Sequence, residues 1–384
     1  MAGEKRRAYS SVEFAVDGRY TLKTLLYKGT FCTTCLAESE DGKFAIKKVF
    51  GKHLKEPKIL RRILRELEIL AHLNGHPDIN TLCDVDMVSK PPHDGFYCYQ
   101  TLFDTDLKRV LASQAPLTND HVNSIMYQLF RGLHYMHSAN VVHRDLKPAN
   151  IHVNCHGKIK ICDFSVASGS SIQSDYYCTR VKMTSYVANE WYRAPETYLC
   201  DDNGSGYTYA LDMWSAGCIL CELILRRPLF KGDNRLEILA NTISIIDRPP
   251  IYLLSDQGKQ YVEAALERYV PPRTNLYTLV NGHKQVTVLA SKLLNYNPAS
   301  RPDARTCLQD DLVKSYYNGR EPSCSQFTFT SDNVPDHALK DILLSETANF
   351  RRKIRSNQKS VASEILRTRV VDPNENSLRA LDGV

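Results

Sequence analysis

The spacing of hydrophobic residues changes along the 384-residue chain. Early in the chain the pattern is that of short strands, at residues 20–22, 31–36 and 44–46, with a hairpin turn at residues 41–42. Residues 95–101 have the same strand character. The first part of the chain therefore predicts a small β-sheet.

Helical spacing occurs between and after these strands. One amphipathic helix is indicated by apolar residues that recur every three or four positions, at Leu60, Ile63, Leu64, Leu67 and Leu70. Residues 122–137 repeat that spacing, residues 212–224 are apolar almost all round, as in a helix buried at a domain centre, and residues 339–350 predict a further helix. A strand-rich part followed by a helix-rich part predicts an α+β protein of two lobes with a cleft between them.

Composition and charge narrow the class of protein. Hydrophobic residues make up 43% of the chain and charged residues 24%, which is typical of globular proteins. The net charge is +6, but residues 351–384 hold eight basic and four acidic residues, which leaves only +2 for the rest. Because most of the basicity lies in a polar tail, the charge disfavours a nucleic-acid binder. We expect the tail to be a solvated end, the alternatives being a nuclear signal or a contact for an acidic partner.

Targeting signals and cysteines indicate an intracellular protein. The longest largely apolar stretch, residues 216–225, is interrupted by Glu222 and is shorter than the roughly 18 to 20 residues of a membrane span. The basic N-terminus leads into no apolar segment, which disfavours a signal peptide. The 12 cysteines are scattered, so we interpret them as reduced thiols. We expect a cytoplasmic and/or nuclear protein without a membrane span.

The strongest chemical signal is the string His-Arg-Asp-Leu-Lys-Pro-Ala-Asn at residues 143–150, followed by Asp-Phe-Ser at residues 163–165. Phosphoryl transfer needs a carboxylate to orient the attacking hydroxyl and take its proton, a cation for the γ-phosphate, and oxygen ligands for Mg²⁺. Asp145, Lys147 and the pair Asn150 and Asp163 supply these groups in that order. The alternative, in which these residues are only helix caps and turn formers, does not account for the whole string.

On these motifs the chain resembles a eukaryotic protein kinase from about residue 20 to residue 315. The resemblance implies an α+β bilobal fold, with a small β-rich N-lobe (residues 20–103) and a larger helical C-lobe (residues 104–315). Residues 1–19 would be an N-terminal tail, and residues 316–384 a C-terminal extension with its basic tail. ATP and Mg²⁺ are the implied cofactors.

The resemblance also implies roles outside the catalytic string. Ala45 would cover adenine and Lys47 would hold the α- and β-phosphates. Glu66 would be the ion-pair partner of Lys47, its alternative being a surface pair with Arg62. The nucleotide site as a whole would comprise Leu26, Tyr27, Gly29, Thr34, Ala45, Lys47, Gln100, Leu102, Phe103, Asp106 and His152.

Further residues match structural and regulatory positions of the family. Glu196 and Arg301 would form the buried pair of the substrate lobe. Asp212 should accept hydrogen bonds from the catalytic loop, since a buried charge without partners is costly. Four arginines match family positions that read phosphate groups: Arg62, Arg65, Arg144 and Arg193.

Residues 184–193 resemble the T-x-Y activation lip and the proline-selecting pocket of mitogen-activated protein (MAP) kinases. Phosphates on Thr184 and Tyr186 would order this loop against arginines, the alternative being an unmodified surface loop. The segments at residues 86–88 and 94–100 resemble the fungal cell-wall and sporulation branch. The implied partners are protein substrates with Ser/Thr-Pro sites, an upstream dual-specificity MAP kinase kinase and a scaffold protein.

The sequence departs from the family at the nucleotide loop and the metal motif. Tyr27 and Cys32 replace two of the three usual glycines, which leaves Gly29. Ser165 replaces the glycine of Asp-Phe-Gly; if that position needs a glycine-like backbone, strain of about 1–3 kcal/mol follows. His152 stands where an apolar adenine floor is usual, and we expect a neutral imidazole that can still stack.

Phosphate reading and docking are also altered. Ser168 and Glu190 stand where arginines are usual, and Glu190 would repel a phosphate on Tyr186. The acidic docking patch, at residues 316–322, keeps a single acid and gains an arginine. Attraction for basic docking peptides should therefore be weaker.

These losses have to be compared with what remains. Every residue with a direct role in phosphoryl transfer is present. An unusual residue at one of the other positions costs about one to three kcal/mol, which lowers the reaction rate by about ten- to a hundredfold. We therefore favour an active kinase over a pseudokinase that acts as a scaffold or allosteric partner.

Overall fold

The computed structural model describes the chain except for residues 1–11, 168–186, 201–207, 329–333, 358–365 and 372–384. It divides into two compact units. Unit 1 comprises residues Met1–Asn74, Asn80–Asp104 and Thr330–Val384, and unit 2 comprises Gly75–Ile79 and Thr105–Phe329.

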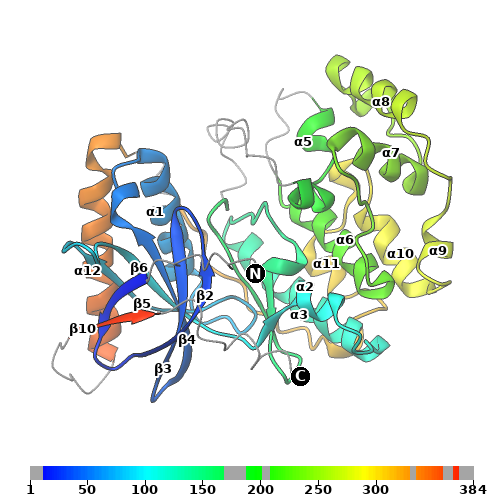
Figure 1. Cartoon of the computed structure of the whole chain (residues 1–384). Helices are drawn as coiled ribbons and strands as arrows, with labels where there is room; N and C mark the ends of the chain where they lie inside the picture. Colours follow the sequence, from blue (N-terminus) through cyan, green and yellow to red (C-terminus); the bar gives the residue numbers. More distant parts are fainter. Residues whose placement is uncertain (1–11, 168–186, 201–207, 329–333, 358–365, 372–384) are drawn as a thin grey trace, which may run out of the picture. The chain divides into compact units, whose positions relative to one another are not determined.

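Unit 1 is built on an antiparallel five-stranded sheet, whose spatial order is β2 (Thr21–Lys28), β3 (Cys32–Ser39), β4 (Gly42–Phe50), β6 (Gly95–Thr101) and β5 (Leu82–Val88) (Figure 1). The strands and the hairpin predicted from the sequence are confirmed. Ser39 pairs with Gly42, whose φ of +126° is one that favours glycine. Alternate residues of β4, such as Phe44 and Ile46, are buried, which leaves Ala45 and Lys47 on the other face.

The predicted amphipathic helix is α1 (Pro57–His72), which begins with proline at its first position, where no backbone donor is needed. The leucine and isoleucine stripe that predicted it is buried throughout. Strand β5 and helix α1 both contact a second helix, α12 (Leu339–Asn357), drawn in orange beside α1 in Figure 1.

Both ends of the chain differ from the prediction. Val12–Asp17, which we placed in the N-terminal tail, forms strand β1, and Phe14 and Val16 are buried in the core of unit 1. Helix α12 does not end near residue 350 but runs to Asn357. The basic tail is not simply a solvated end, because Leu366–Val371 forms strand β10, which pairs antiparallel with β1. The pairing partner lies about 350 residues away along the chain, so no local pattern indicates it.

Ion pairs attach α12 to the sheet. Arg351 donates to Asp86 at 2.7 Å and lies 3.7 Å from Asp84, both on β5. Arg19 also pairs with Asp84, so two arginines share two largely buried carboxylates. Helix α12 of the C-terminal extension is thereby an integral part of unit 1, whereas residues 316–329 belong to unit 2.

Unit 2 is mainly helical, with a small sheet of β7 (Thr105–Asp106), β8 (Ile151–Val153) and β9 (Ile159–Ile161). Its α-helices in the described residues are α2 (Leu107–Ala112), α3 (Asn119–Ser138), α5 (Glu196–Leu199), α6 (Ala210–Leu225), α7 (Arg235–Ile246), α8 (Asp256–Arg268), α9 (Leu276–Leu279), α10 (Lys284–Leu293) and α11 (Ala304–Cys307).

The two long helices of unit 2 match the sequence analysis. Helix α3 begins at a capping box made by Thr118 and His121, and its apolar stripe is buried. Helix α6 is buried almost all round, as predicted, with Trp214 among the largest fully buried side chains. Within the described part of the chain, no helix has the length and apolar character required to cross a bilayer.

Candidate active site

The first group of predicted site residues lies in unit 1, around β4 and α1. Lys47 Nζ donates to both carboxylate oxygens of Glu66, at 3.1 and 2.9 Å. Glu66 sits beside the buried stripe of α1. Of the two interpretations of Glu66, the structure therefore has the pair with Lys47, which fixes the position of the lysine side chain.

Gln100, at the end of β6, is held by a side-chain network that the sequence analysis missed. Asn80 Nδ2 donates to Gln100 Oε1 at 2.7 Å, and Gln100 Nε2 donates to Cys98 Sγ at 3.3 Å. Asn80 Oδ1 in turn accepts from the hydroxyl of Thr101 at 3.0 Å. Asn80 is buried, but it lies among mixed polar and apolar residues, so no sequence pattern indicated its role.

The glycine-poor loop between β2 and β3 has a tyrosine next to its remaining glycine. A Cβ placed on Gly29 would lie 2.6 Å from the hydroxyl of Tyr27, so the ring passes directly beside the glycine backbone. Gly29 N donates to Cys32 O at 2.9 Å and closes the turn. Tyr27 is 58% exposed, so its ring is not anchored in the core.

The second group lies in unit 2, on the loop after α3. Lys147 Nζ donates to Asp145 Oδ2 at 2.6 Å. Asn150 Nδ2 donates to the same oxygen at 3.1 Å and to the backbone carbonyl of Asp145 at 2.8 Å. Both side-chain contacts use Oδ2, and Asn150 sits in a short 3₁₀ turn begun by Pro148. The spacing of the catalytic string thus brings three of its side chains together.

Asp212, at the start of α6, accepts hydrogen bonds from the backbone of this loop. Its two oxygens accept backbone hydrogen bonds from His143 at 2.8 Å and Arg144 at 2.9 Å, as the sequence analysis expected. His137 Nε2, a partner that we did not predict, lies 3.0 Å from Oδ2. Burial alone would raise the pKa of Asp212, but the hydrogen bond and charge of His137, with those of His143, lower it overall. Arg144 has a φ of +69°, a strained conformation that these bonds hold in place.

Asp163 lies next to Asn150, since Cys162 N donates to the carbonyl of Asn150 at 2.9 Å. Phe164 is fully buried and packs on His143, with ring centroids 5.3 Å apart. The left-handed conformation in this motif falls on Asp163, with φ of +66°, and not on Ser165. The strain that we made conditional on a glycine-like backbone at Ser165 is therefore absent.

The serine in the metal motif makes a contact that glycine cannot make. Ser165 Oγ donates to Asp163 Oδ1 at 2.7 Å, and Ser165 N is directed at the same oxygen at 3.4 Å. No sequence pattern predicted this hydrogen bond, because it depends on the side-chain rotamers of both residues.

His152 lies on β8, opposite Asp106 of β7. Burial lowers the pKa of His152, and the charges of Asp106 and Asp163 only partly oppose this. The imidazole is therefore neutral near pH 7, which agrees with the expectation for this position.

Glu196 and Arg301 form a bidentate ion pair, with distances of 2.6 and 2.7 Å. The arginine side chain is fully buried and lies over the ring of Trp214. Two backbone carbonyls, of Asn295 and Ala210, accept its remaining donors. A buried charge needs such complete pairing, and this pair links segments about a hundred residues apart.

The activation lip is only partly described. Thr184, Tyr186 and Ser168 lie outside the described residues. Glu190, which we expected to repel a phosphate, accepts a bidentate pair from Arg235 at 2.7 and 2.8 Å, and Arg193 lies 3.7 Å away. Two arginines thus neutralise the acidic substitution, and Arg235, at the start of α7, was not predicted.

The acid that remains in the docking patch is also engaged. Glu321 accepts a hydrogen bond from the hydroxyl of Tyr127, and the Tyr127 ring stacks on Tyr316 at 5.6 Å. Burial and the adjacent carboxylate raise the pKa of Tyr127 to about 12. The charge of Glu321 is therefore less available to a basic peptide than its position in the sequence suggests.

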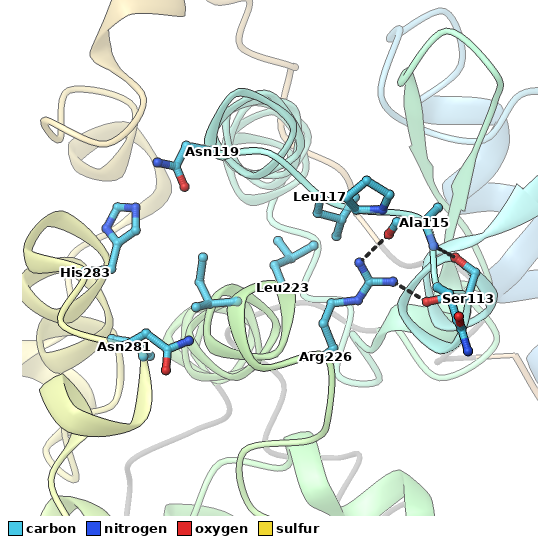
Figure 2. Close-up of a pocket in the computed structure, with 12 residues that line it drawn as sticks. Ser113, Ala115, Leu117, Asn119, Leu223, Arg226, Asn281 and His283 are labelled. Atoms are coloured by element: carbon cyan, nitrogen blue, oxygen red, sulfur yellow. Dashed lines mark hydrogen bonds between the residues drawn. The ribbon is translucent and has the colours of Figure 1, made fainter.

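Unit 2 also contains a cavity of about 590 Å³, shown in Figure 2. Arg226 lines it, but its guanidinium donates to the carbonyls of Val110, Ser113 and Ala115, so it caps the end of α2. The predicted site residues that the structure describes are not among those lining this cavity. We assign no chemistry to it.

The donor set fits a magnesium ion. Asn150 donates to Asp145 through its amide nitrogen, so its amide oxygen is the atom that would bind a metal. With the carboxylate of Asp163, this provides two hard oxygen donors on adjacent segments, which is the ligand type that Mg²⁺ prefers when phosphates complete its shell.

Comparison with known proteins gives a consistent result. A family model described as "Protein kinase domain" matches residues 20–313. The chain is 36% identical to the mitogen-activated protein kinase SLT2/MPK1 of Saccharomyces cerevisiae over 89% of this chain and 72% of the relative. It is 35% identical to the mitogen-activated protein kinase spm1 of Cytospora mali, covering 93% and 85% of the two chains. It is 31% identical to the sporulation-specific mitogen-activated protein kinase SMK1 of S. cerevisiae, covering 92% and 94%.

Proposed function

This chain belongs to the mitogen-activated protein kinase family, and from that premise we propose that it transfers the γ-phosphoryl of Mg-ATP to Ser or Thr residues followed by Pro. The observation that supports this most is the Asp145, Lys147 and Asn150 cluster beside Asp163. The four side chains are of the types that phosphoryl transfer requires, which supports the proposal.

Asp145 orients the substrate hydroxyl and takes its proton. Lys147 and Asn150 both bind its Oδ2, so the other carboxylate oxygen is the one presented to the hydroxyl. Lys147 is 15% exposed, and its ammonium adds positive charge where the γ-phosphoryl would carry negative charge.

Asn150 and Asp163 hold the metal, which supplies charge neutralisation between the phosphates when it is bound. Lys47, fixed by Glu66, binds the α- and β-phosphates. We propose that the adenosine is bound by the nucleotide residues named from the sequence, with Gln100 held in one orientation by Asn80.

Phosphorylation of Thr184 and Tyr186 by an upstream dual-specificity kinase is the proposed switch, read by Arg65, Arg144 and Arg193. A scaffold protein is a further proposed partner, and we propose a cytoplasmic and/or nuclear location.

The test is transfer of labelled phosphate to a protein with Ser-Pro or Thr-Pro sites. The full chain is co-expressed with a MAP kinase kinase, and Asp145→Asn serves as the matched control. We expect Mg²⁺-dependent labelling that falls by at least a hundredfold in the control. Equal labelling by the control refutes the proposed role of Asp145, and nucleotide binding without any transfer supports a pseudokinase.

The switch is tested separately. Thr184→Ala and Tyr186→Phe should each lower the activity of the co-expressed chain, while leaving its melting temperature unchanged. Unchanged activity in both variants would show that the lip is not the switch.

A further inference from the structure

Ser165 takes the position of the family's metal-motif glycine, and its hydroxyl is bonded to the carboxylate two residues earlier. Ser165 Oγ donates to Asp163 Oδ1 at 2.7 Å, a normal length for a hydroxyl–carboxylate hydrogen bond. The backbone N–H of Ser165 is directed at the same oxygen at 3.4 Å. Both groups therefore act on one oxygen of Asp163.

The surrounding residues hold both ends of this contact. Phe164, between the two residues, is fully buried and packs on His143. The preceding residue, Cys162, is anchored by its N–H to the carbonyl of Asn150. Since Asp163 has a positive φ and Ser165 does not, the backbone turns at Asp163 and brings the two side chains to the same side.

We propose that Ser165 is a positioning residue for the magnesium ligand Asp163. Its hydroxyl fixes one carboxylate oxygen, so that the other is presented to the metal in one orientation. The inference rests on the proposed function, in which Asp163 binds Mg²⁺.

The physical basis is the geometric demand of the metal. Mg²⁺ requires near-ideal octahedral coordination at short distances, so a carboxylate that rotates freely loses entropy when it binds. Hydrogen bonds to a ligating carboxylate remove this freedom in advance, and their loss typically lowers metal affinity by 10–100-fold. Asp163 is exposed, so packing alone does little to hold its side chain.

Three substitutions distinguish the effect of the Ser165 hydroxyl on metal binding from any effect of the backbone conformation at this position. Ser165→Ala removes the hydroxyl and keeps the Cβ, Ser165→Gly restores the family residue, and Ser165→Thr keeps the hydroxyl. Ser244→Ala is the matched control, since it removes a serine hydroxyl that bonds only a carbonyl within α7.

Metal affinity is measured without relying on catalysis. In the first experiment the full chain is saturated with ADP and titrated with Mn²⁺, and free Mn²⁺ is followed by electron paramagnetic resonance. In the second, the Mg²⁺ dependence of the ADP-induced rise in melting temperature gives an independent value of the metal affinity. We expect both to show at least tenfold weaker metal binding in the alanine and glycine variants. The threonine variant and Ser244→Ala should remain within about threefold of the unsubstituted chain.

Each other outcome overturns the inference. Unchanged affinity in the alanine and glycine variants would show that the hydroxyl does not position the ligand. Tighter binding in them would show that the hydroxyl competes with the metal for Asp163. Asp163→Asn distinguishes these failures from failure of the proposed function: if the unsubstituted chain and Asp163→Asn bind metal equally, Asp163 is not the ligand, and both proposals fall.

Discussion

Replacing Asp212 by asparagine should destabilise unit 2, because this carboxylate accepts three hydrogen bonds at a fully buried position. In asparagine an amide nitrogen replaces one carboxylate oxygen. At the Oδ1 position this nitrogen would face the N–H of Arg144, and two donors cannot form a hydrogen bond, so that bond is lost. The bonds from His143 and His137 change from charged to neutral acceptors. Hydrogen bonds to charged groups contribute about 1.5–3 kcal/mol and neutral ones about 0.5–1.5, so the total loss is about 3–5 kcal/mol.

A loss of this size lowers the melting temperature by on the order of 10 °C for a unit of about 230 residues. Thermal unfolding of the full chain, followed by circular dichroism, measures it. Asp233→Asn is the matched control, since Asp233 is an exposed residue of the same unit, and it should melt like the unsubstituted chain. A melting temperature for Asp212→Asn within about 2 °C of that value would refute this account of the buried carboxylate.

The same bonds predict a dependence on pH. The pKa of Asp212 is lower in the folded state than in the unfolded state, where aspartate has a pKa of about 3.9. Its stabilisation is therefore fully present above that value and is lost as the pH falls through the lower pKa of the folded state. The gap in melting temperature between the unsubstituted chain and Asp212→Asn should be constant above pH 5 and narrow below pH 4. A gap that widens on acidification contradicts the reasoning.

Four further substitutions test the contacts of unit 1. Glu66→Gln should lower kcat by about 10–100-fold, since a neutral amide holds Lys47 less firmly; steady-state kinetics measure it, and an unchanged kcat argues against the pair. Asn80→Ala should destabilise the chain by about 1–3 kcal/mol, because it removes two hydrogen bonds, one to the half-buried Gln100 and one from Thr101. Chemical denaturation measures this, and a neutral effect would show that water replaces the contacts. Arg351→Ala should loosen α12 and speed its limited proteolysis, with Asp86→Asn giving the same direction; unchanged cleavage would show that apolar packing alone holds the helix.

Local patterns in the sequence determined the chemistry of this protein. The spacing from Asp145 to Asn150 places three side chains within one loop and one 3₁₀ turn, so the cluster follows from neighbouring residues alone. The stripe of α1 and the alternation in β4 are likewise short-range patterns, and the structure has both elements where the sequence predicts them.

Pairings between distant segments were decided by the tertiary structure. Strands β1 and β10 come from opposite ends of the chain, and Arg235 neutralises Glu190 from 45 residues away. From its sequence position alone, Glu190 was expected to repel a phosphate on Tyr186, because the sequence does not show which opposite charge lies beside it in the fold. Only folding brings the second charge within hydrogen-bonding distance.

Side-chain orientation was also beyond the sequence. Strain at Ser165 was expected only if its backbone had to be glycine-like; the positive φ lies at Asp163 instead, and the serine hydroxyl donates to that carboxylate. Periodicity and spacing report which residues are near along the chain and which face they share. Whether two polar atoms then form a bond depends on rotamers and on burial from all sides, and these are properties of the packed protein.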